Sequence, residues 1–243
     1  MEPIYIDQFT ISDLQCDRFG RLKPSAILWL VQEMAGRHCK ILGLDWNTLA
    51  GKGMFWAIIR HRVQVKQMPR QGDTIRIETW PMPTSRVAYP RNVVAFDDRG
   101  NELFRTTSLW VLMDMHSRAM ILPGKSGVEV SGVLRGDELP VPGSLPPVQL
   151  SGRHTRTVAF TDLDLNGHMN NCRYLDWAMD LLPSQFHQDH PLQDLTLGYL
   201  AEAKEADALT LCHQLQQDNL RLEIQRCQDG KEQRIFCADV HFG

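Results

Sequence analysis

The sequence lacks the features of a membrane, secreted or metal-binding protein. No apolar run approaches the length that crosses a bilayer, and the first residues have no signal-peptide pattern. The six cysteines are scattered without C-x-x-C spacing. Six histidines also lack metal-ligand spacing or neighbours: His61, His116, His154, His187, His190 and His213. We therefore expect a cytoplasmic protein with reduced thiols, without membrane insertion, metal or cofactor.

The sequence also lacks a strong charge of either sign. Its formal net charge of −3 gives no overall attraction to nucleic acid, so we expect no nucleic-acid partner, although a local basic patch stays open. No phosphate-binding glycine loop is found, because Gly51-Lys52-Gly53 is short and follows no strand signal. The chain has 243 residues with 43% hydrophobic and 23% charged residues, which is typical of a globular protein with one large domain or two small ones.

Hydrophobic periodicity predicts the same series of elements twice. The first series is a strand near 3–11, a helix from about Pro24 to Leu42 that stops at Gly43, and strands from Met54 and near 73–80, 86–96, 102–114 and 118–122. A stretch rich in proline and glycine follows over 123–150. The second series is a strand near 153–160, a helix capped by Asn170 or Asn171 and ended by Pro183, and strands near 194–203, 207–216, 219–228 and 231–241.

The two series align at fixed offsets. Asp17 aligns with Asp164 at an offset of 164 − 17 = 147, which Gly20 and Gly167 share, and the segment 72–77 resembles 206–211 at an offset of 134. Both helices are too apolar to face water, so each should be wrapped by its own sheet. We predict an α+β tandem double hotdog, in which each half is a long helix wrapped by an antiparallel sheet, with halves at 1–125 and 151–243 and a linker at 126–150.

A group of polar residues breaks this repeat. Asn166 aligns with Phe19, His168 aligns with Arg21, and Glu202 aligns with Met68. The scaffold is thus duplicated but the polar group occurs once, which a loop needed only for turns would not explain.

Two motifs resemble a known family. They are Asp164-Leu-Asn166-Gly-His168-Met-Asn170-Asn171-Cys-Arg-Tyr174 and Leu197-Gly-Tyr199-Leu-Ala-Glu202. They resemble the D-x-N-x-H-x-N-N-x-x-Y and L-x-Y-x-x-E motifs of plant and bacterial acyl-acyl carrier protein (acyl-ACP) thioesterases. Weaker matches occur at 72–80 and 107–113, so the resemblance covers nearly the whole chain. It implies a double hotdog enzyme that hydrolyses fatty acyl-ACP, releases the free fatty acid and ends fatty acid synthesis, with acyl carrier protein as its partner.

The resemblance implies that Asp164, Asn166, His168 and Glu202 form the catalytic network. Many plant members have a cysteine directly after the glutamate, but this chain has Ala203, which excludes a cysteine nucleophile there. We expect Cys172 to be a buried structural thiol.

Thioester hydrolysis needs water, a base and donors for the oxyanion. Our hypothesis makes Glu202 the base, on a strand where we expect it to be buried. Asn166 would hold water or the carbonyl, His168 would assist proton transfer, and Asp164 would orient one of them. Backbone N–H groups at the start of the following helix could complete the oxyanion site. Whether Glu202 or His168 is the base stays open.

The acyl chain needs an apolar tunnel, and the first half, which lacks the polar group, is the expected place. Candidate lining residues are Trp29, Leu30, Met34, Met54, Phe55 and Trp56, although for each one taken singly a plain core position is the favoured interpretation. The acidic carrier should dock on basic residues near the tunnel mouth, for which the candidates are Arg153, Arg156 and Arg173, with Arg86 and Arg91 as weaker ones.

Other readings stay open. The chain could be an acyl-CoA thioesterase or a hydroxyacyl dehydratase, although the D-x-N-x-H-x-N-N pattern favours hydrolysis. It could also be a non-catalytic acyl-binding or regulatory module. Acyl-chain length, the choice between ACP and CoA, and the oligomeric state, including a homodimer, are not determined by the sequence.

Overall fold

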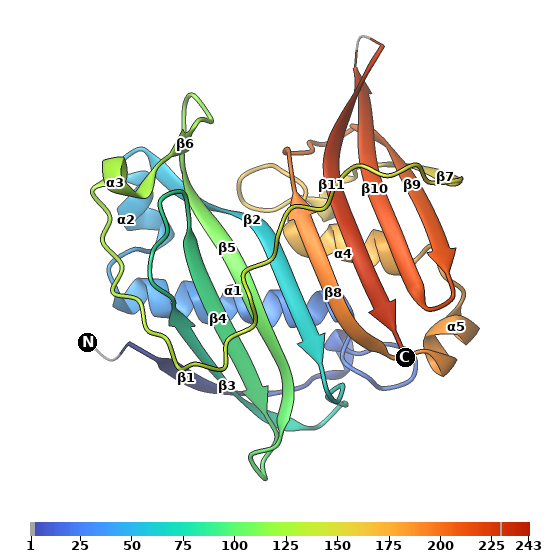
Figure 1. Ribbon diagram of the computed structural model, residues 1–243, viewed down its shortest axis with the longest axis horizontal. Helices are drawn as coiled ribbons and strands as arrows, with labels where there is room; N and C mark the ends of the chain where they lie inside the picture. Colours follow the sequence, from blue (N-terminus) through green and yellow to red (C-terminus); the bar gives the residue numbers. More distant parts are fainter. Residues whose placement is uncertain (1–2, 229) are drawn as a thin grey trace.

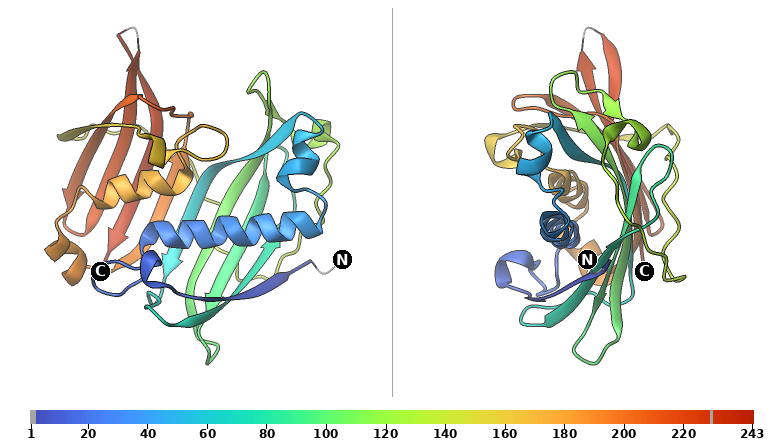
Figure 2. Two further views of the ribbon diagram at one scale, coloured as in Figure 1. Left: turned by 180° about the vertical axis from the view of Figure 1, so that it is seen from behind. Right: turned by 90° about the vertical axis from the view of Figure 1, so that its left-hand side faces the viewer.

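The computed structural model describes residues 3–228 and 230–243. In this part of the chain, eleven strands form one sheet with antiparallel neighbours, in the order β1-β3-β4-β5-β2-β8-β11-β10-β9-β7, and β6 pairs with β5 (Figure 1). The helices α1 and α4 lie side by side on one face of this sheet (Figure 2).

The N-terminal half contains β1 (Tyr5–Thr10), α1 (Pro24–Ile41), α2 (Trp46–Ala50), β2 (Met54–Val65), β3 (Thr74–Pro81), β4 (Tyr89–Phe96), β5 (Glu102–Asp114), β6 (Met120–Ile121) and α3 (Pro123–Ser126). The C-terminal half contains β7 (Gly152–Thr157), α4 (Asn171–Met179), α5 (Ser184–Asp189), β8 (Leu192–Tyr199), β9 (Ala208–Gln216), β10 (Asn219–Gln228) and β11 (Lys231–Phe242). Short 3₁₀ helices at Asp13–Gln15 and Phe160–Asp162 precede α1 and α4. The repeated series of elements is thus confirmed.

The long helix α1 has the ends and the buried face that its sequence predicts. Pro24 occupies its first turn, where its missing N–H has no partner to lose, and Gly43 follows the helix with φ +69°. Ile27, Leu30 and Met34 are fully buried on the sheet side. Trp29 is 47% exposed and therefore belongs to the outer side of the helix.

Helix α4 is shorter than predicted. The Oδ1 atom of Asn170 accepts the backbone N–H of Cys172 at 2.9 Å, which makes Asn170 the N-cap. The helix ends at Met179, before Pro183, which instead precedes the unpredicted helix α5. Helix α2 was also missed; it begins where Asp45 accepts the N–H groups of Asn47 and Thr48.

The two halves form one sheet rather than two, which corrects the expectation that each helix has its own. Strand β2 pairs with β8 from Arg60–Gly198 to Gln64–Asp194, and the Arg62–Asp194 ion pair at 3.0 Å spans the same junction. One main core lies beneath both helices. Its largest fully buried side chains include Phe104 from the first half and Trp177 and Phe236 from the second. The predicted double hotdog architecture is confirmed, with its two sheets joined edge to edge.

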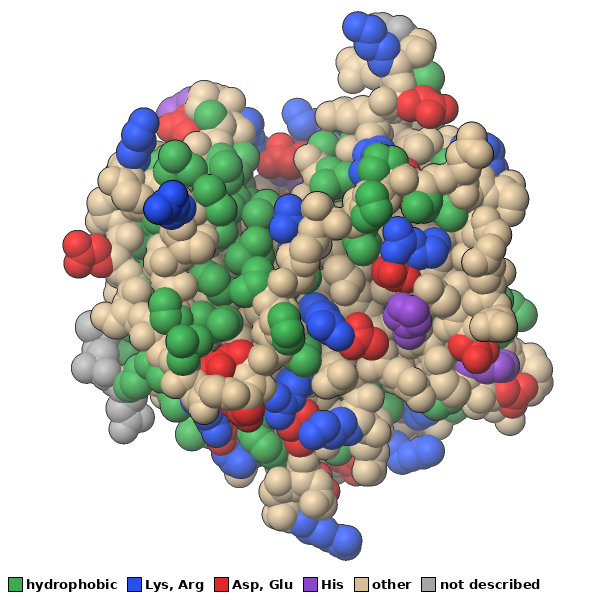
Figure 3. Space-filling view, viewed as in Figure 1, with side chains coloured by type: hydrophobic (Ala, Val, Ile, Leu, Met, Phe, Trp, Pro, Cys, Tyr) green, Lys and Arg blue, Asp and Glu red, His purple; other side chains and the backbone are tan. Residues whose placement is uncertain are grey.

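The segment between α3 and β7 crosses the outer face of the sheet, opposite the helices (Figure 1). Its backbone is held by side chains from both halves: Thr107 donates to the carbonyl of Leu139 at 2.9 Å, and Arg234 donates to that of Leu145 at 3.3 Å. Beside it, hydrophobic side chains gather over the N-terminal half (Figure 3). The domain boundaries 1–125, 126–150 and 151–243 remain a prediction.

Among the helices that the structure describes, none combines the length and the apolar character that a bilayer crossing requires.

Stability at low pH should depend on one buried histidine. His61 on β2 is fully buried, and neither ring nitrogen has a hydrogen-bond partner among the described groups. Burial lowers the pKa of His61 from 6.5 to about 3, so the unfolded chain takes up a proton first as the pH falls. The stability provided by neutral His61 is therefore present above pH 6.5 and is lost from there toward pH 3.

We predict that His61→Leu reduces the acid sensitivity of the fold. Between pH 6 and pH 4 the parent should lose about 2 kcal/mol more unfolding free energy than the variant, measured by urea denaturation. The exposed His116→Leu serves as the control and should keep the parental slope. Equal slopes for the parent and His61→Leu would contradict the prediction.

Candidate active site

The polar loop before α4 has the same backbone as the loop before α1. The Oδ1 atom of Asp164 accepts the backbone N–H groups of Asn166 at 2.8 Å and His168 at 3.3 Å. In the first half, Oδ1 of Asp17 accepts those of Phe19 at 2.8 Å and Arg21 at 3.0 Å. The two aspartates therefore build the same turn, and only the side chains held on it differ.

The glycines of the two turns also match. Gly20 has φ +71° and Gly167 has φ +73°, and each donates its N–H to the carbonyl of its aspartate at 3.0 Å. A left-handed backbone at this position favours glycine in both halves. The repeat seen in the sequence is therefore a repeat of loop geometry, with a different side-chain set in each copy.

Backbone pairing brings the distant Glu202 to this loop. The N–H of Met169 donates to the carbonyl of Ala203 at 2.8 Å, and His168 pairs with Lys204 in an isolated bridge. Glu202 directly precedes Ala203 in the chain, and its Oε2 lies 3.2 Å from Nε2 of His168. Residues 34 apart in the sequence (202 − 168) thus meet through their side chains.

The environment of Glu202 differs from the expectation. Strand β8 ends at Tyr199, so Glu202 lies beyond the strand rather than on it. Its side chain is 39% exposed, whereas that of His168 is only 10% exposed. The carboxylate is therefore open to water, and the expected burial of Glu202 is wrong.

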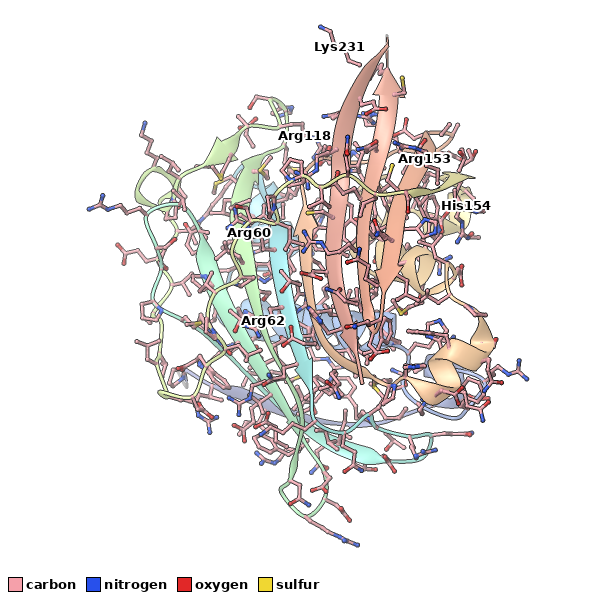
Figure 4. The ribbon with its side chains drawn as sticks, turned by 45° about the vertical axis from the view of Figure 1, so that its right-hand side comes forward. Arg60, Arg62, Arg118, Arg153, His154 and Lys231 are labelled. Carbon is pink, nitrogen blue, oxygen red and sulfur yellow. The ribbon has the colours of Figure 1, made fainter. Side chains whose placement is uncertain are left out.

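A residue of the first half completes the cluster. Arg118, in the turn between β5 and β6, places Nη2 3.3 Å from Nε2 of His168 and Nη1 3.6 Å from Oε1 of Glu202. Figure 4 shows Arg118 at the end of the molecule where the two halves meet, away from Arg60 and Arg62 on β2. Its guanidinium also lies 5.0 Å from the ring centre of Phe55. This contact was not predicted from the sequence, because Arg118 lies outside both motifs.

Arg118 and Glu202 require opposite protonation states of Nε2 of His168. An arginine N–H only donates, so its contact needs an unprotonated Nε2, whereas the carboxylate of Glu202 only accepts and needs Nε2–H. One nitrogen satisfies one partner at a time, and each protonation state of His168 therefore has its own partner. Such an arrangement suits a histidine that gains and loses a proton at Nε2.

The remaining motif residues support this geometry. Tyr199 donates to the carbonyl of Asn171 at 3.2 Å, and Tyr174 stacks on Phe236 with ring centres 4.9 Å apart, which ties α4 to the ends of β8 and β11. The N-cap contact of Asn170 occupies one of the backbone donors that we expected to be free at the start of α4. The side-chain amide of Asn166, which donates to Oδ2 of Asp164 at 3.4 Å, retains a second N–H.

Cys172 is a buried thiol beside Gln32 of α1, which donates to its sulfur at 3.4 Å. Burial raises the pKa of the Cys172 thiol to about 12, so the thiol stays protonated and is a poor nucleophile. Within the described residues, no group of three or more His, Cys, Asp or Glu side chains is placed to hold a metal ion.

A cavity of about 640 Å³ lies in the N-terminal half and reaches the polar loop. Leu165 and Asn166 contribute to one part of its wall, whereas the rest comes from α1, α2 and the sheet of the first half. The lining is mainly apolar and aromatic: Ala35, Gly36, Leu42, Leu44, Trp46, Trp56, Pro81, Tyr89, Pro90, Trp110 and Val130, with Gln32, Cys39, Lys40, Asp45, Asn47 and Arg91.

Only one of the six candidate lining residues, Trp56, is on this wall. Leu30 and Met34 are fully buried in the main core, where they face the sheet under α1. Met54 packs in a smaller cluster with Leu49, Leu112 and others. The ring of Phe55 packs against the guanidinium of Arg118. Trp29 is on the outer side of α1, as described above. The hydrophobic character of these residues in the sequence does not distinguish those on the cavity wall from those in the core.

Comparisons with known proteins identify related chains. The family model described as acyl-ACP thioesterase N-terminal domain matches residues 2–122, and the one described as acyl-ACP thioesterase C-terminal domain matches residues 147–238. A chloroplastic palmitoyl-acyl carrier protein thioesterase of Gossypium hirsutum is 28% identical over 217 residues, which cover 82% of this chain and 52% of that protein.

An oleoyl-acyl carrier protein thioesterase of Arabidopsis thaliana is 23% identical over 231 residues, covering 84% of this chain and 62% of that protein. The chain thus spans about half to three fifths of the curated relatives that it matches.

Solved structures share the whole fold. An acyl-ACP thioesterase from Bacteroides thetaiotaomicron superimposes with a TM-score of 0.86 and 24% identity, covering 99% of this chain and 98% of that one. A 12:0-ACP thioesterase from Umbellularia californica gives a TM-score of 0.82 and 21% identity, covering 100% of this chain and 98% of that one. At these identities the likeness supports the double hotdog architecture.

Proposed function

Because this chain belongs to the acyl-ACP thioesterase family, we propose that it hydrolyses the thioester between a fatty acyl chain and acyl carrier protein. The free fatty acid would be released, which ends fatty acid synthesis. One observation carries the proposal: the His168–Glu202 contact of 3.2 Å lies next to Asn166, which is on the wall of a largely apolar cavity.

In the proposed reaction, Asn166 binds the thioester carbonyl. Asp164 fixes the backbone of Asn166 and accepts one of its amide hydrogens, so the other N–H can donate to the carbonyl oxygen as negative charge develops there. Because Asp17 makes the matching turn in the first half, the role of Asp164 is to position its neighbours rather than to react.

The pair of Glu202 and His168 would move the protons. Glu202, which water can reach, takes a proton from the attacking water while the water oxygen bonds to the carbonyl carbon. His168 receives this proton from Glu202 at Nε2 and passes it to the sulfur as the C–S bond breaks. Arg118 holds Oε1 of Glu202 in place and offers His168 a partner once Nε2 has lost its proton.

The acyl chain would occupy the cavity of the N-terminal half. Its wall carries Trp46, Trp56, Tyr89 and Trp110, and Trp56 contacts Tyr89 edge to face with ring centres 4.9 Å apart. Large rigid rings that border an apolar cavity set how much chain fits, because a packed interior adapts little to added volume.

Four of the five basic residues that the sequence offered for carrier docking are poorly suited to it. Arg156 pairs with Asp180 at 2.8 Å and Arg173 pairs with Asp162 at 2.9 Å, so their charges are already matched. Arg91 is buried, at 6% exposure, and its assignment to docking is wrong. Arg153 lies on the edge strand β7, away from Arg118 (Figure 4).

Two exposed lysines are better placed. Lys40 lines the cavity, and Lys204 pairs through its backbone with His168. Leu165 on the polar loop is fully exposed and also lines the cavity. We assign Lys40 and Lys204 to docking of the acidic carrier. The homodimer, the cytoplasmic location and the choice of ACP over CoA remain proposals or open points.

Removal of each catalytic side chain should abolish most turnover. Glu202→Gln, Asn166→Ala and His168→Ala should each lower kcat by about a hundredfold or more, because each removes a proton carrier or an oxyanion donor. Thiol release from acyl-ACP, followed in parallel with acyl-CoA, measures the effect and the carrier preference. Normal turnover of acyl-ACP by all three variants would show that the assignment is wrong.

Aspartate variants supply a matched control for these measurements. Asp164→Asn and Asp17→Asn disturb the same turn in opposite halves, so they should destabilise the fold similarly. Only Asp164→Asn should lower kcat. An equal loss of kcat in both variants would point to a general effect on folding.

Cavity size should set the preferred chain length. We expect Trp56→Ala to shift the kcat/KM profile toward longer acyl chains, measured on a series of saturated acyl-ACPs, because it adds volume at the cavity wall. Met34→Leu, which alters the main core and not the wall, should leave the profile unchanged. An identical profile for Trp56→Ala and the parent would remove Trp56 from the chain-binding wall.

Carrier docking should depend on charge. Lys40→Ala and Lys204→Ala should each raise KM for acyl-ACP roughly threefold at low salt, as expected of one exposed charge pair, and leave KM for acyl-pantetheine nearly unchanged. Arg156→Ala is the control because its charge is already paired. A parental KM for acyl-ACP in both lysine variants would exclude this docking surface.

A further inference from the structure

An arginine is buried in the wall of the mainly apolar cavity. Arg91 lies on β4, is 6% exposed, and borders the cavity together with Cys39 and Pro81. Strand β4 is separated from β8 by β5 and β2, so Arg91 lies deep in the N-terminal half, whereas Asn166 borders the cavity from the other half. A chain that enters beside Asn166 would therefore approach Arg91 with its distal part.

The neighbours of Arg91 do not neutralise it. Its Nη1 contacts Nδ1 of His38 and Oγ1 of Thr79, both at 3.1 Å, and its Nη2 contacts the sulfur of Cys39 at 3.9 Å. Burial raises the pKa of the Cys39 thiol, so this sulfur carries no negative charge. Among the residues that the structure describes, no carboxylate forms an ion pair with Arg91, whereas Arg105 and Arg221, which also have low exposure, each have one.

A charged group that is buried without a counter-ion is costly to keep unless it binds something polar. Burial lowers the pKa of the Arg91 guanidinium, yet arginine remains charged at all ordinary pH values. Among the described groups, the sulfur of Cys39 is the only partner of its Nη2, and sulfur is a weak acceptor. A saturated acyl chain would bring no acceptor to this donor, whereas an oxygen atom on the chain would.

We propose that Arg91 makes the cavity selective for acyl chains that carry an oxygen, as a hydroxyl or a keto group, on a carbon beyond the thioester. The oxygen accepts a hydrogen bond from the guanidinium, and Cys39 and Thr79 fix the plane of that guanidinium. This inference rests on the proposed thioesterase function and adds the class of acyl chain to it.

The test compares pairs of acyl-ACPs of equal chain length, with and without one hydroxyl or keto oxygen placed at successive carbons. At the favoured position we expect kcat/KM for the oxygenated chain to exceed that for the plain chain about tenfold, as one hydrogen bond to a charged group would give. Arg91→Met should remove this ratio and Arg91→Lys should keep part of it. Equal kcat/KM values at every position would overturn the inference.

A control variant tests whether the effect is specific to Arg91 or follows from the loss of any arginine in this half. Arg86→Met removes an exposed arginine of the same half and should keep the parental ratio. A matching loss of the ratio in Arg86→Met and Arg91→Met would contradict a role specific to Arg91.

Binding to the parent protein provides a readout that needs neither variants nor turnover. Calorimetry with non-hydrolysable acyl-pantetheine amides should show tighter binding of the oxygenated chain at the same position. Tighter binding without hydrolysis of any acyl-ACP would refute the proposed function and support the inference. Hydrolysis of acyl-ACP with equal binding of both chains would support the proposed function and refute the inference.

Discussion

The candidate site depends on a short stretch of backbone pairing between two loops. The N–H of Met169 donates to the carbonyl of Ala203, and the flanking residues His168 and Glu202 are thereby brought side by side, at 3.2 Å between Nε2 and Oε2. The same pairing exists in the first half, where Leu22 donates to the carbonyl of Pro69 at 2.8 Å. Neither loop belongs to a long strand, so these few hydrogen bonds fix the distance between the two side chains.

The duplicated fold explains how one copy can carry the chemistry. Asp17 and Asp164 hold the same turn with the same contacts, and the copies diverge only in the side chains that project from it. Arg21 in the first half donates to the carbonyl of His187 in the second, whereas His168 in the second half meets Arg118 from the first. Each turn therefore contacts the opposite half. The pairing of β2 with β8 joins the two halves, so that residues of one half can reach the turn of the other.

Because the polar side chains of the candidate site are held on the turn of the second half, the first half can enclose a cavity. Its helix α1 and the strands β2, β4 and β5 border the cavity, whereas the shorter helix α4 packs its side chains into the main core. The proposed reaction thus takes place at the junction of the halves, with the carbonyl held from one side and the chain from the other. Arg91 adds a buried charge to a wall that offers mainly apolar surface.

Four features could be predicted from the amino-acid order alone: the series of elements, the repeat, the family, and the placement of Asp164, Asn166 and His168 in one turn. These features are local: periodicity follows from helix and strand geometry, and a motif of ten residues lies on one loop. The sequence did not determine the exposure of Glu202, the approach of Arg118, the single sheet, or the separation of Trp56 on the cavity wall from Leu30 and Met34 in the core. These were decided by the tertiary structure, because they depend on which distant elements pack together, and hydrophobic residues read alike in the sequence whether they face a cavity or a core.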